Sequence, residues 1–527
     1  MKHLLLLSGA VGAGKTTLSS DLHDRYGARV IKTRDLITEL VPEVEQKRRP
    51  LQDAGDRLDR ETQGRWVAQA LERLAPEEPF VVVDAVRRAE QVDAARERFP
   101  NVRVQHIHLW ASEDVLTTRY KGRAQPGDDT TSYSAVRENL TEAEVNQLEG
   151  VCDVLIDTVR SLPKDVLVRA AARLGLYHTG AGALVDVLIG AQWGSEGKGH
   201  VAWYLAREYD VLVRVGGPNA GHSTIDPYKF HLLPSGTIVN PRARLLIGPG
   251  ATLAVPTLLR EIEDCAVTPE RLSIDPQAMI IEPDDIEYET ANLAGIGSTA
   301  QGGGFAAARR LMRGGLREGA PVRLARDVPE FAPYIRSTLQ QLEDAYCKSQ
   351  RVFVEGTQGA GLSLYHGPFP YVTSRDTTAC GTLAECGIPP KRVRRVIMVV
   401  RSYPIRVGGT SGPLPQEISW DVVAARAGLD PVQLKKREIT TTTGRDRRVG
   451  EFDWEQFRRA CSLNAPTDLA LTFADYLDGD NENARRFEQL SPNAIRFVEE
   501  LEGVGGANVS LITTRFHERS IIDRRAW

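Results

Sequence analysis

The sequence predicts an α/β protein with two units. The first is an N-terminal phosphate-loop (P-loop) domain with a doubly wound parallel sheet, and the second is a larger α/β domain. Three observations lead to this prediction. Apolar runs alternate with helical segments along the chain, glycine-rich loops follow two of these runs, and 527 residues are too many for one small core.

Composition narrows the class of protein. Charged residues make up 26% of the chain and hydrophobic residues 42%, as in ordinary globular domains. A net charge of −4 offers no broad basic surface, so we expect no nucleic-acid partner. The six cysteines form no CxxC pair, which argues against a zinc site or a disulfide framework and fits a reducing cytoplasm. The apolar run Leu4–Leu7 is too short for a signal peptide or a membrane span.

The first apolar run leads into GAVGAGKT, which matches the P-loop pattern GxxxxGK[ST] between a strand and a helix. The glycines let backbone N–H groups surround phosphate oxygens. Lys15 neutralises phosphate charge and the Thr16 hydroxyl reaches Mg²⁺. The expected ATP-binding residues of this domain are Gly9, Gly12, Gly14, Lys15, Thr16, Thr17 and Asp84.

Asp84 ends the predicted strand FVVVDAV, where a carboxylate can orient Mg²⁺. Further strands are predicted at VRVQHIHLW and CDVLIDT. Arg87 and the arginines of RYKGR (119–123) suit a phosphate clamp, or a solvated helix face. Asp35 either faces an acceptor or caps the helix LITELV. With these motifs, residues 3–176 resemble small P-loop kinases of the nucleoside-monophosphate and deoxynucleotide-monophosphate type.

A domain boundary is predicted near residue 180. The helical pattern DVLVRAAARLGL is followed by YHTGAGAL, which is small and glycine-rich and suits a linker. We therefore expect a first domain at 1–176, a linker at 177–184 and a second domain at 185–527. Strands of the second domain are predicted at VLIGA, RLLIGPG, RVFVEG, RVIMVV and VSLIT.

The second glycine loop, QWGSEGKGH, differs from a P-loop. Gln192 stands where the pattern needs glycine, and Lys198 is followed by Gly199, so no hydroxyl is placed for Mg²⁺. A glycine-rich turn with one lysine before a helix still suits phosphate. This loop therefore predicts a second, different nucleotide site.

Several long motifs follow this loop in order: VGGPNAGHS, HLLPSG, GIGSTAQGGG, FVEGTQGAGLSLYHGPFPYVTSRDTTACG, SYPIRVGGTSGPLP, TTTTGRDRRVG and LALTFAD. Together they resemble the adenylosuccinate synthetase family across residues 184–527. The resemblance implies a large central sheet, a homodimer, and a ligase for purine biosynthesis. A nucleotide donor (GTP, or ATP or dATP) with Mg²⁺ phosphorylates O6 of a purine monophosphate, and L-aspartate then displaces that phosphate at C6.

The resemblance also implies roles for single residues, matched by motif. His222 would be the general acid, acting with Ser195, Lys198 and Gln358 at the reacting centre. The donor would meet Gly197, Lys198, Gly199 and Asp475, and the carbonyl of Gly221 would touch Mg²⁺. The purine monophosphate would meet Asn219, Thr299, Arg313, Gln358 and Thr373, with Arg313 reaching the neighbouring subunit. The aspartate carboxylates would meet Thr442, Thr443, Arg445 and Arg447.

Physical chemistry supports this assignment. A phosphoryl group in transfer needs lysine, imidazole and Mg²⁺ together, and a dicarboxylic amino acid needs converging cations. GRDRR supplies three arginines within four positions. Taken alone, GRDRR also suits a solvated loop, and a lone histidine such as His222 also suits a structural role.

Three departures from the family pattern bear on substrate choice. Ser195 stands where the family has an aspartate that accepts the N1 proton and ligates Mg²⁺. Phe473 replaces a lysine, and Thr513–Phe516 (TTRF) replaces STGP, so an adenine donor becomes plausible. The serine and the shortened domain resemble 2-aminoadenylosuccinate synthetases of the PurZ type, whose acceptor is dGMP.

Three alternatives stay open. One is a ligase for dGMP or GMP joined to a monophosphate kinase. Another is an ordinary adenylosuccinate synthetase acting on IMP with GTP. The third is a nucleotide-sensing regulatory protein with weak turnover, in which the missing carboxylate reflects lost catalysis.

Overall fold

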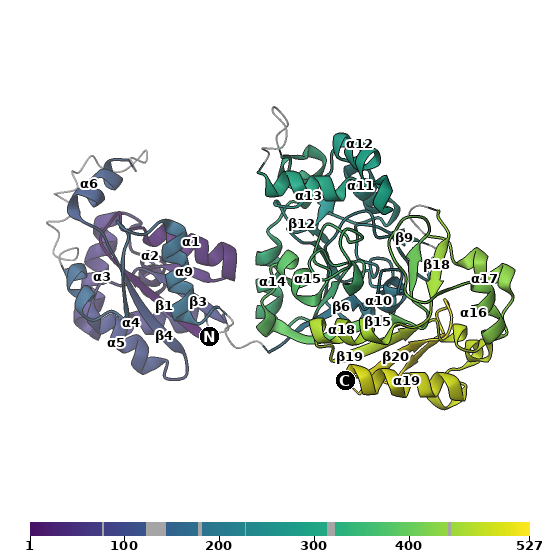
Figure 1. The fold of residues 1–527 in the computed structure, drawn as a ribbon. Helices are drawn as coiled ribbons and strands as arrows, with labels where there is room; N and C mark the ends of the chain where they lie inside the picture. The colour runs from purple at the N-terminus through teal and green to yellow at the C-terminus, as the bar shows by residue number, and fades with distance from the viewer. Residues whose placement is uncertain are drawn as a thin grey trace. The chain divides into compact units, whose positions relative to one another are not determined.

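The computed structural model describes residues 1–75, 78–122, 144–177, 182–226, 228–313, 322–440 and 444–526. The chain forms two compact units, Met1–Thr179 and Gly180–Trp527 (Figure 1). Both are α/β folds built on parallel sheets, which confirms the predicted fold class.

The first unit is built on a five-stranded sheet, within the residues that are described. Its order is β2 (Arg29–Lys32), β3 (Phe80–Asp84), β1 (His3–Ser8), β4 (Arg103–Trp110) and β5 (Val154–Asp157), and every neighbouring pair is parallel. Successive side chains of a strand point to opposite faces. Leu5 and Leu7 accordingly enter one core cluster, and Leu4 and Leu6 enter another. Both faces of this sheet are therefore covered.

Helices flank both faces of the first sheet. They are α1 (Lys15–Tyr26), α2 (Thr33–Leu40), α3 (Arg48–Thr62), α4 (Arg65–Leu74), α5 (Ala89–Arg98), α6 (Glu113–Lys121) and α9 (Pro163–Leu174). Helices α1 and α9 supply Leu18 and Leu167 to the cluster that holds Leu5, whereas α4 supplies Trp66 to the opposite cluster. The doubly wound arrangement places the loop before α1 at the carboxyl end of β1.

The second unit contains a nine-stranded sheet in its described residues. Its order is β12 (Leu272–Ile274), β10 (Arg244–Ile247), β7 (Val211–Arg214), β14 (Val352–Glu355), β6 (Val185–Gly190), β15 (Val393–Arg401), β19 (Asp468–Thr472), β20 (Asn508–Thr513) and β21 (Ile521–Asp523). All pairs are parallel except β20 with β21. Every residue of the central strand β6 is buried, as expected for a strand covered on both faces.

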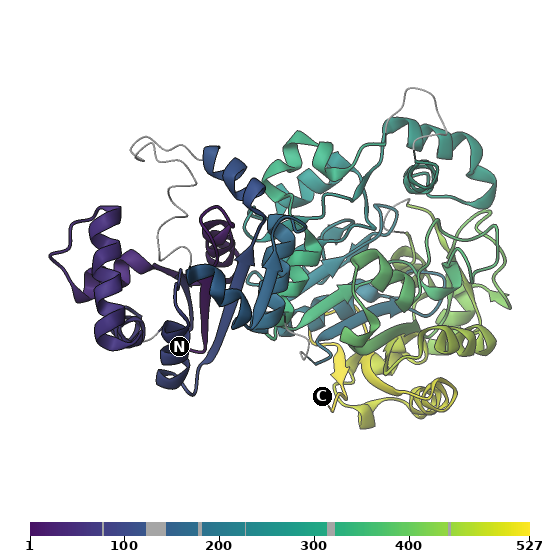
Figure 2. The same cartoon turned by 90° about the vertical axis from the view of Figure 1, so that its left-hand side faces the viewer.

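Helices cover both faces of this larger sheet (Figures 1 and 2). Val187 and Leu188, neighbours in β6, belong to different core clusters on the two faces. The helices are α10 (Lys198–Leu205), α11 (Val255–Asp264), α12 (Pro283–Asn292), α13 (Gly303–Leu311), α14 (Thr338–Cys347), α15 (Ala379–Cys386), α16 (Trp420–Ala427), α17 (Pro431–Arg437), α18 (Trp454–Asn464) and α19 (Pro492–Gly505).

Three small sheets complete the second unit as described. They are β8 (His222–Ser223) with β9 (Lys229–Phe230), β11 (Thr252–Leu253) with β13 (Met279–Ile280), and β16 (Ile405–Val407), β18 (Arg447–Gly450) and β17 (Glu417–Ile418). The first and third carry His222 and Arg447, and so place two expected site residues.

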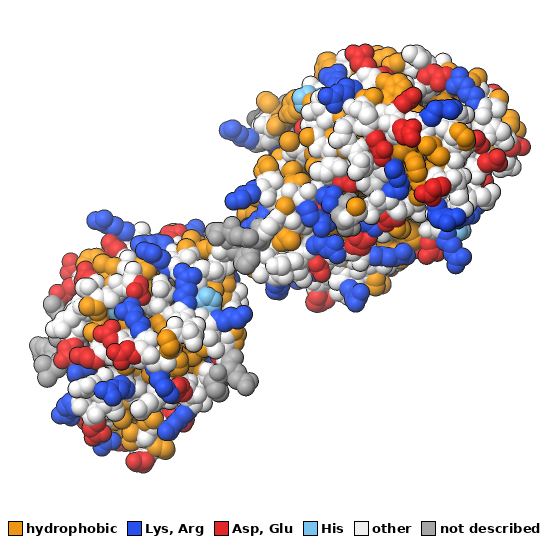
Figure 3. All heavy atoms as spheres, turned by 90° about the horizontal axis from the view of Figure 1, so that it is seen from below, with side chains coloured by type: hydrophobic (Ala, Val, Ile, Leu, Met, Phe, Trp, Pro, Cys, Tyr) orange, Lys and Arg blue, Asp and Glu red, His pale blue; other side chains and the backbone are white. Residues whose placement is uncertain are grey.

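Basic and acidic side chains are interspersed over the face of the molecule seen in Figure 3, in both units. That distribution agrees with the small net charge of −4. Among the described helices, none combines the length and apolar character that crossing a bilayer requires.

Candidate functional site

A cavity of about 920 Å³ opens in the second unit at the carboxyl ends of the sheet strands. Its wall includes segments that follow β6, β7, β14, β15 and β19, the usual place for ligands in parallel α/β sheets. Twelve residues expected from the sequence line it: Ser195, Gly197, Lys198, Gly199, Asn219, Gly221, His222, Thr299, Gln358, Thr373, Arg447 and Asp475.

The loop after β6 leads directly into helix α10. Gly197 precedes the helix with φ 86°, a left-handed conformation that glycine adopts without strain. Helix α10 then begins at Lys198, so free backbone N–H groups and the positive end of the helix face the cavity. A Cβ at Gly199 would lie 2.6 Å from the carbonyl oxygen of Ser223, so this glycine permits the close approach of β8.

Lys198 forms an ion pair with Glu196, and both side chains are buried. The other carboxylate oxygen of Glu196 accepts hydrogen bonds from the backbone N–H groups of Gln192 (3.1 Å) and Gly194 (2.9 Å). Glu196 therefore positions the lysine and holds the loop. Because its oxygens are occupied in this way, Glu196 is poorly placed to serve as a free base next to Ser195.

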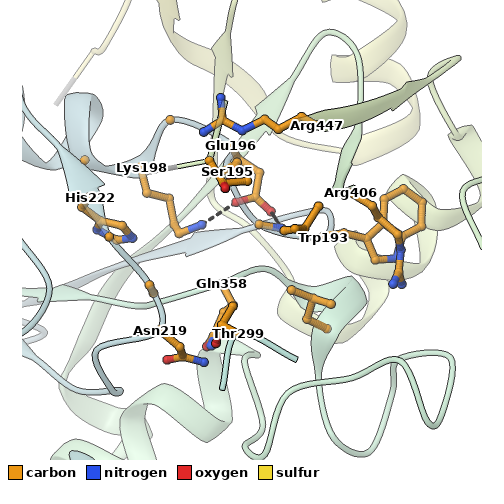
Figure 4. A pocket seen from close by; sticks show the side chains of 18 of the residues that line it. Trp193, Ser195, Glu196, Lys198, Asn219, His222, Thr299, Gln358, Arg406 and Arg447 are labelled. Carbon is orange, nitrogen blue, oxygen red and sulfur yellow. Dashed lines mark hydrogen bonds and ion pairs between the residues drawn. The ribbon is translucent and has the colours of Figure 1, made fainter. Parts of the chain in front are cut away.

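Ser195 occupies a left-handed conformation with φ 54°. Its carbonyl oxygen accepts a hydrogen bond from Nη1 of the buried Arg401 at 3.3 Å, and its side chain faces the cavity (Figure 4). The site thus presents a hydroxyl where the family pattern has a carboxylate. A hydroxyl is a much weaker base and a neutral metal ligand.

His222 reaches the cavity from β8, and its Nδ1 is hydrogen-bonded to Oε1 of Glu355 at the end of β14. Glu355 also accepts hydrogen bonds from Arg214 Nη1 (3.0 Å) and from the backbone N–H of Ser235 (2.7 Å). These bonds fix the orientation of the carboxylate, and the carboxylate fixes the orientation of the imidazole.

Burial and charge set the protonation of this pair. Burial, aided by the nearby Arg214 charge, lowers the pKa of His222 to about 4 against the opposing effect of Glu355. Burial would raise the pKa of Glu355, but Arg214 and His222 outweigh it and lower that pKa to about 2. At neutral pH the free site therefore holds a neutral imidazole against an ionised carboxylate.

The side chains of Asn219, Thr299 and Gln358 lie on one side of the cavity (Figure 4). Gln358 has φ 58°, donates a hydrogen bond to Thr373 Oγ1 at 3.1 Å, and accepts one from Thr357 Oγ1 at 3.2 Å. This wall offers amide and hydroxyl groups, which suit the hydrogen-bonding edges of a purine and the oxygens of its phosphate.

Arg447 lies on the opposite side of the cavity, held by Glu438 (3.0 Å from Nη1 to Oε2). The same carboxylate accepts hydrogen bonds from Arg401 Nη2 at 3.1 Å and from the Tyr476 hydroxyl at 2.6 Å. Burial would raise the pKa of Glu438, but the two arginines outweigh it and lower that pKa. The network fixes the position of the Arg447 guanidinium at the cavity wall.

Two expected residues that the structure describes, Arg313 and Arg445, are not among the residues that line the cavity. Arg313 follows α13 with φ 54°, and Arg445 is exposed, with its backbone N–H bonded to Thr440 Oγ1 at 2.9 Å. Thr442 and Thr443 lie outside the described residues. Their roles toward aspartate and a neighbouring subunit stay predictions.

The expected magnesium site of the second unit offers mainly neutral oxygens, from Ser195 and Gly221. Across the described residues, no group of three or more His, Cys, Asp or Glu side chains is arranged to hold a metal. Mg²⁺ commonly takes phosphate oxygens and water as most of its ligands. The residues therefore fit a Mg²⁺ ion that arrives with a nucleotide.

The loop of the first unit forms a separate site. Lys15 Nζ donates hydrogen bonds to the carbonyl oxygens of Gly9 (2.6 Å) and Ala10 (3.0 Å). Gly12, Gly14 and Thr17 belong to the same loop and first helical turn, and Thr16 Oγ1 donates to Asp84 Oδ2 at 3.2 Å. A hydroxyl and a carboxylate side by side at a helix N-terminus fit Mg²⁺ with phosphate.

Arg119 and Asp35, two polar side chains of the first unit, lie in different surroundings. Arg119 donates hydrogen bonds to Thr158 Oγ1 and to its carbonyl oxygen, both at 2.9 Å, and lies 3.4 Å from the carbonyl oxygen of Gly12. It is therefore next to the loop rather than on a solvated helix face. The expectation that Asp35 is the N-cap is wrong, because α2 begins two residues earlier, at Thr33, with Lys32 as its N-cap. Asp35 lies in the first turn and accepts a hydrogen bond from the backbone N–H of Lys32 at 3.1 Å, which closes that turn.

Sequence reasoning missed several residues that hold the second site together: Glu196, Arg214, Glu355, Arg401, Glu438 and Tyr476. A charged residue in or directly after a buried strand was the available signal, since Glu355 ends RVFVE and Arg401 ends the strand after RVIMVV. Such residues need buried partners, but the sequence does not name them.

Comparison with known proteins gives two family matches. The family model described as "Adenylosuccinate synthetase" matches residues 187–327 and 322–482, and the one described as "AAA domain" matches residues 4–154. Adenylosuccinate synthetase of Pyrococcus sp. (strain ST700) is 40% identical over 351 residues, spanning 64% of this chain and 98% of the relative. That of Methanocaldococcus jannaschii is 36% identical over 351 residues, spanning 64% and 96%.

Two solved structures share the fold of the second unit. Fully ligated adenylosuccinate synthetase from Plasmodium falciparum matches with a TM-score of 0.57 at 24% identity, covering 65% of this chain and 100% of that chain. Cyanophage S-2L succinoaminodeoxyadenylate synthetase (PurZ), bound to dGMP and to dATP as an energy donor, matches with a TM-score of 0.53 at 28% identity, covering 65% and 95%.

Proposed function

Because this chain belongs to the adenylosuccinate synthetase family, we propose that its second unit joins L-aspartate to C6 of a purine monophosphate. The proposal rests mainly on one observation: a single cavity is lined by Lys198, His222, Gln358 and Arg447. A lysine and an imidazole on one side suit phosphoryl transfer, and a fixed arginine on the other suits a carboxylate.

The reaction has two steps. In the first, O6 of the purine attacks the terminal phosphorus of a nucleoside triphosphate, the nucleoside diphosphate leaves, and N1 loses its proton. In the second, the amino group of aspartate attacks C6 and loses a proton, and the C6–O6 bond breaks to release phosphate. Phosphorylation turns a poor leaving group into a good one.

The chain's own groups serve these steps from fixed positions. Lys198 and the N–H groups of Gly197 and Gly199 bind donor phosphates at the N-terminus of α10. His222, held by Glu355, faces the phosphoryl group in transfer. Asn219, Thr299, Gln358 and Thr373 hold the purine monophosphate. Mg²⁺, when bound by Gly221 and Ser195 with phosphate oxygens, supplies positive charge against the phosphoryl group.

The acceptor we favour is a guanine monophosphate, dGMP or GMP, giving 2-aminoadenylosuccinate. Guanine carries an amino group at C2, next to N1, and serine leaves more room there than aspartate and accepts a hydrogen bond from that amine. The similarity to the PurZ structure bound to dGMP supports this choice. Since the carboxylate of Glu196 is occupied, the N1 proton leaves through water, aspartate or phosphate.

The second candidate acceptor is IMP, supported by the identity of 40% to an adenylosuccinate synthetase. The test uses purified protein with aspartate, Mg²⁺, ATP or GTP, and IMP, GMP or dGMP, with each product identified by mass. We expect condensation with a guanine monophosphate. Turnover of IMP without turnover of GMP or dGMP would reject the guanine acceptor and leave the ligase assignment standing.

For the first unit, which carries a AAA domain, we propose a nucleoside-monophosphate kinase activity. Lys15, Thr16 and Asp84 form the phosphate and Mg²⁺ site that such transfer needs. A ligase and a monophosphate kinase on one chain would act in one nucleotide pathway, with a lyase step between them to remove fumarate. We further propose a homodimer in the cytoplasm, in which Arg313 reaches the neighbouring subunit.

A further inference from the structure

Asp475 is a buried acidic residue of the cavity wall, and one of its carboxylate oxygens lacks a hydrogen-bond partner among the described residues. It lies in the short helix Ala474–Tyr476 after β19, is only 4% exposed, and lines the cavity. Its Oδ1 has no hydrogen-bond partner among the described residues. Because a buried polar atom without a partner is costly, this oxygen points to a ligand that completes it.

The surroundings disfavour a charged carboxylate. Burial raises the pKa of Asp475 to about 7; the exposed Arg437 opposes this, and the acids Glu482 and Glu438 add to it. The cations nearest those acids are already engaged, since Arg515 pairs with Glu482 at 2.8 Å and Arg401 and Arg447 pair with Glu438.

His200 also lines the cavity, and its imidazole supplies no charge against Asp475 at neutral pH. Burial lowers the pKa of His200 to about 4, and the ring of His200 packs edge-on against Phe516, with centroids 5.2 Å apart. The backbone N–H of His517 is turned to the Ser520 hydroxyl at 3.2 Å. The phenol of Tyr476 is held by Glu438.

Aromatic rings stand beside Asp475 in the cavity. Phe473 lies two residues before it, and the guanidinium of Arg401 packs 4.1 Å from the centre of one face of its ring. Phe516, which is 55% exposed, lines the cavity from the segment after β20. Flat apolar rings next to a hydrogen-bonding group form the kind of site that takes a nucleobase.

We propose that Asp475 selects the base of the phosphate donor as a neutral carboxylic acid, which favours adenine over guanine. The acid O–H donates to N1 of adenine, and the carbonyl oxygen accepts from the N6 amino group. Guanine presents two donors, N1–H and the C2 amine, and so needs an ionised carboxylate with two acceptors. Protonation of one side chain thereby decides which nucleotide the ligase site uses.

This inference rests on the proposed ligase activity, and it adds the donor class and its pH dependence. The neutral acid predominates below about pH 7 and the carboxylate above it. The preference for ATP over GTP should therefore fall as pH rises. A ratio of the two donors cancels the effects of other titrating groups that act on both alike.

The test uses the full chain carrying Lys15→Ala, so that the first unit does not consume the donor. The ratio of kcat/KM for ATP to that for GTP is measured from pH 6 to 9 by chromatography of the ligation product. We expect ATP to be favoured by at least about tenfold at pH 6, with the ratio falling about tenfold by pH 8.5.

Asp475→Asn is the informative variant, because an amide matches the neutral acid at every pH. It donates to N1 and accepts from N6, so we expect the ATP preference to persist at pH 8.5. Asp478→Asn makes the same change three residues away, outside the cavity, where Asp478 accepts from the backbone N–H of Asp480 at 3.1 Å. This control should keep the pH dependence of the parent.

Two results would overturn the proposal: a preference for GTP at pH 6, or a ratio that does not change with pH in the parent chain. If no ligation occurs with either donor, the proposed function fails instead. Equilibrium binding of ADP and GDP to the same Lys15→Ala chain at pH 6 and 8.5 then decides the base preference separately. Tighter binding of GDP than of ADP at pH 6 would reject the proposed preference for adenine.

Discussion

The imidazole of His222 and the carboxylate of Glu355 form a buried hydrogen-bonded pair, although 133 positions separate them in the chain. Since Glu355 has a pKa of about 2, the carboxylate is ionised at neutral pH and accepts the Nδ1 proton of His222. The neutral imidazole then has no proton on Nε2. It becomes a donor to a phosphoryl oxygen only after taking up a second proton.

Donor binding should therefore be accompanied by proton uptake. The pKa of His222 is about 4 in the free site, chiefly because of burial, and the negative phosphates raise it toward neutrality. Calorimetric titration of the Lys15→Ala chain with donor and acceptor, in two buffers of different ionisation enthalpy, measures this uptake. At pH 7 we expect the parent chain to take up as much as about one proton per site more than His222→Asn does, because any uptake at Asp475 is common to both proteins. Equal uptake in both proteins would contradict the assignment.

Replacing Ser195 by aspartate should shift the acceptor from guanine toward hypoxanthine. The carboxylate supplies a base for N1 of IMP and crowds the C2 amine of guanine, and the φ of 54° at this position is tolerated by aspartate. We expect the ratio of kcat/KM for IMP to that for dGMP to rise by about tenfold or more.

Ser195→Asn separates the two causes, because asparagine has the size of aspartate without its basicity. It should lose dGMP turnover and gain no IMP turnover. A rise in IMP turnover with asparagine would show that size alone, and not the missing base, sets the acceptor.

Much of the architecture was predictable from the sequence, because buried parallel strands leave contiguous apolar runs. The run at 393–401 and the run at 185–190 pair as neighbours in the sheet, and both nucleotide loops follow such runs. The three-stranded sheet β16–β18–β17 was not predicted, because its strands have two to four residues and carry no period.

The site was predictable only where a residue belongs to a local motif. Lys198 and His222 stand in glycine-rich loops whose spacing has a mechanical meaning. The roles of Glu355 and Glu438 were not predictable, even though Glu355 stands in the motif FVEGTQGAG, because their partners His222 and Arg401 lie 133 and 37 positions away. Which buried acid meets which buried base depends on the three-dimensional packing, and a single sequence holds no signal for it.

Mutation of Lys15 should separate the two activities. Lys15 Nζ lies against its own loop carbonyls in the first unit, whereas the described residues that line the cavity all belong to the second unit. Lys15→Ala should lower monophosphate phosphorylation by about a hundredfold or more and leave ligation within about twofold. Lys198→Ala should lower ligation and leave monophosphate phosphorylation nearly unchanged. Loss of both activities in either variant, with folding intact by circular dichroism, would contradict independent sites.

The buried acid Glu438 should stabilise the second unit strongly. It is 2% exposed and faces two arginines and Tyr476, so Glu438→Gln leaves Arg401 and Arg447 without their countercharge. Removing one partner from a buried ion network costs about 3–5 kcal/mol. Hydrogen exchange in β15 and β19 should report that loss, while exchange in β1 of the first unit stays unchanged.

The loss of unfolding free energy caused by Glu438→Gln should become smaller at low pH. Because the folded pKa of Glu438 is lowered from 4.5, its charge stabilises the fold above that value, and the benefit disappears as pH falls below it. The difference between Glu438→Gln and the parent should therefore be constant above about pH 5 and shrink toward lower pH. Asp421→Asn is the matched control, since the pair that Asp421 forms with Lys435 is half exposed on both sides and should change stability by less than about 1 kcal/mol. A loss of the same size in both variants would show that the Glu438 network adds nothing beyond an ordinary surface pair.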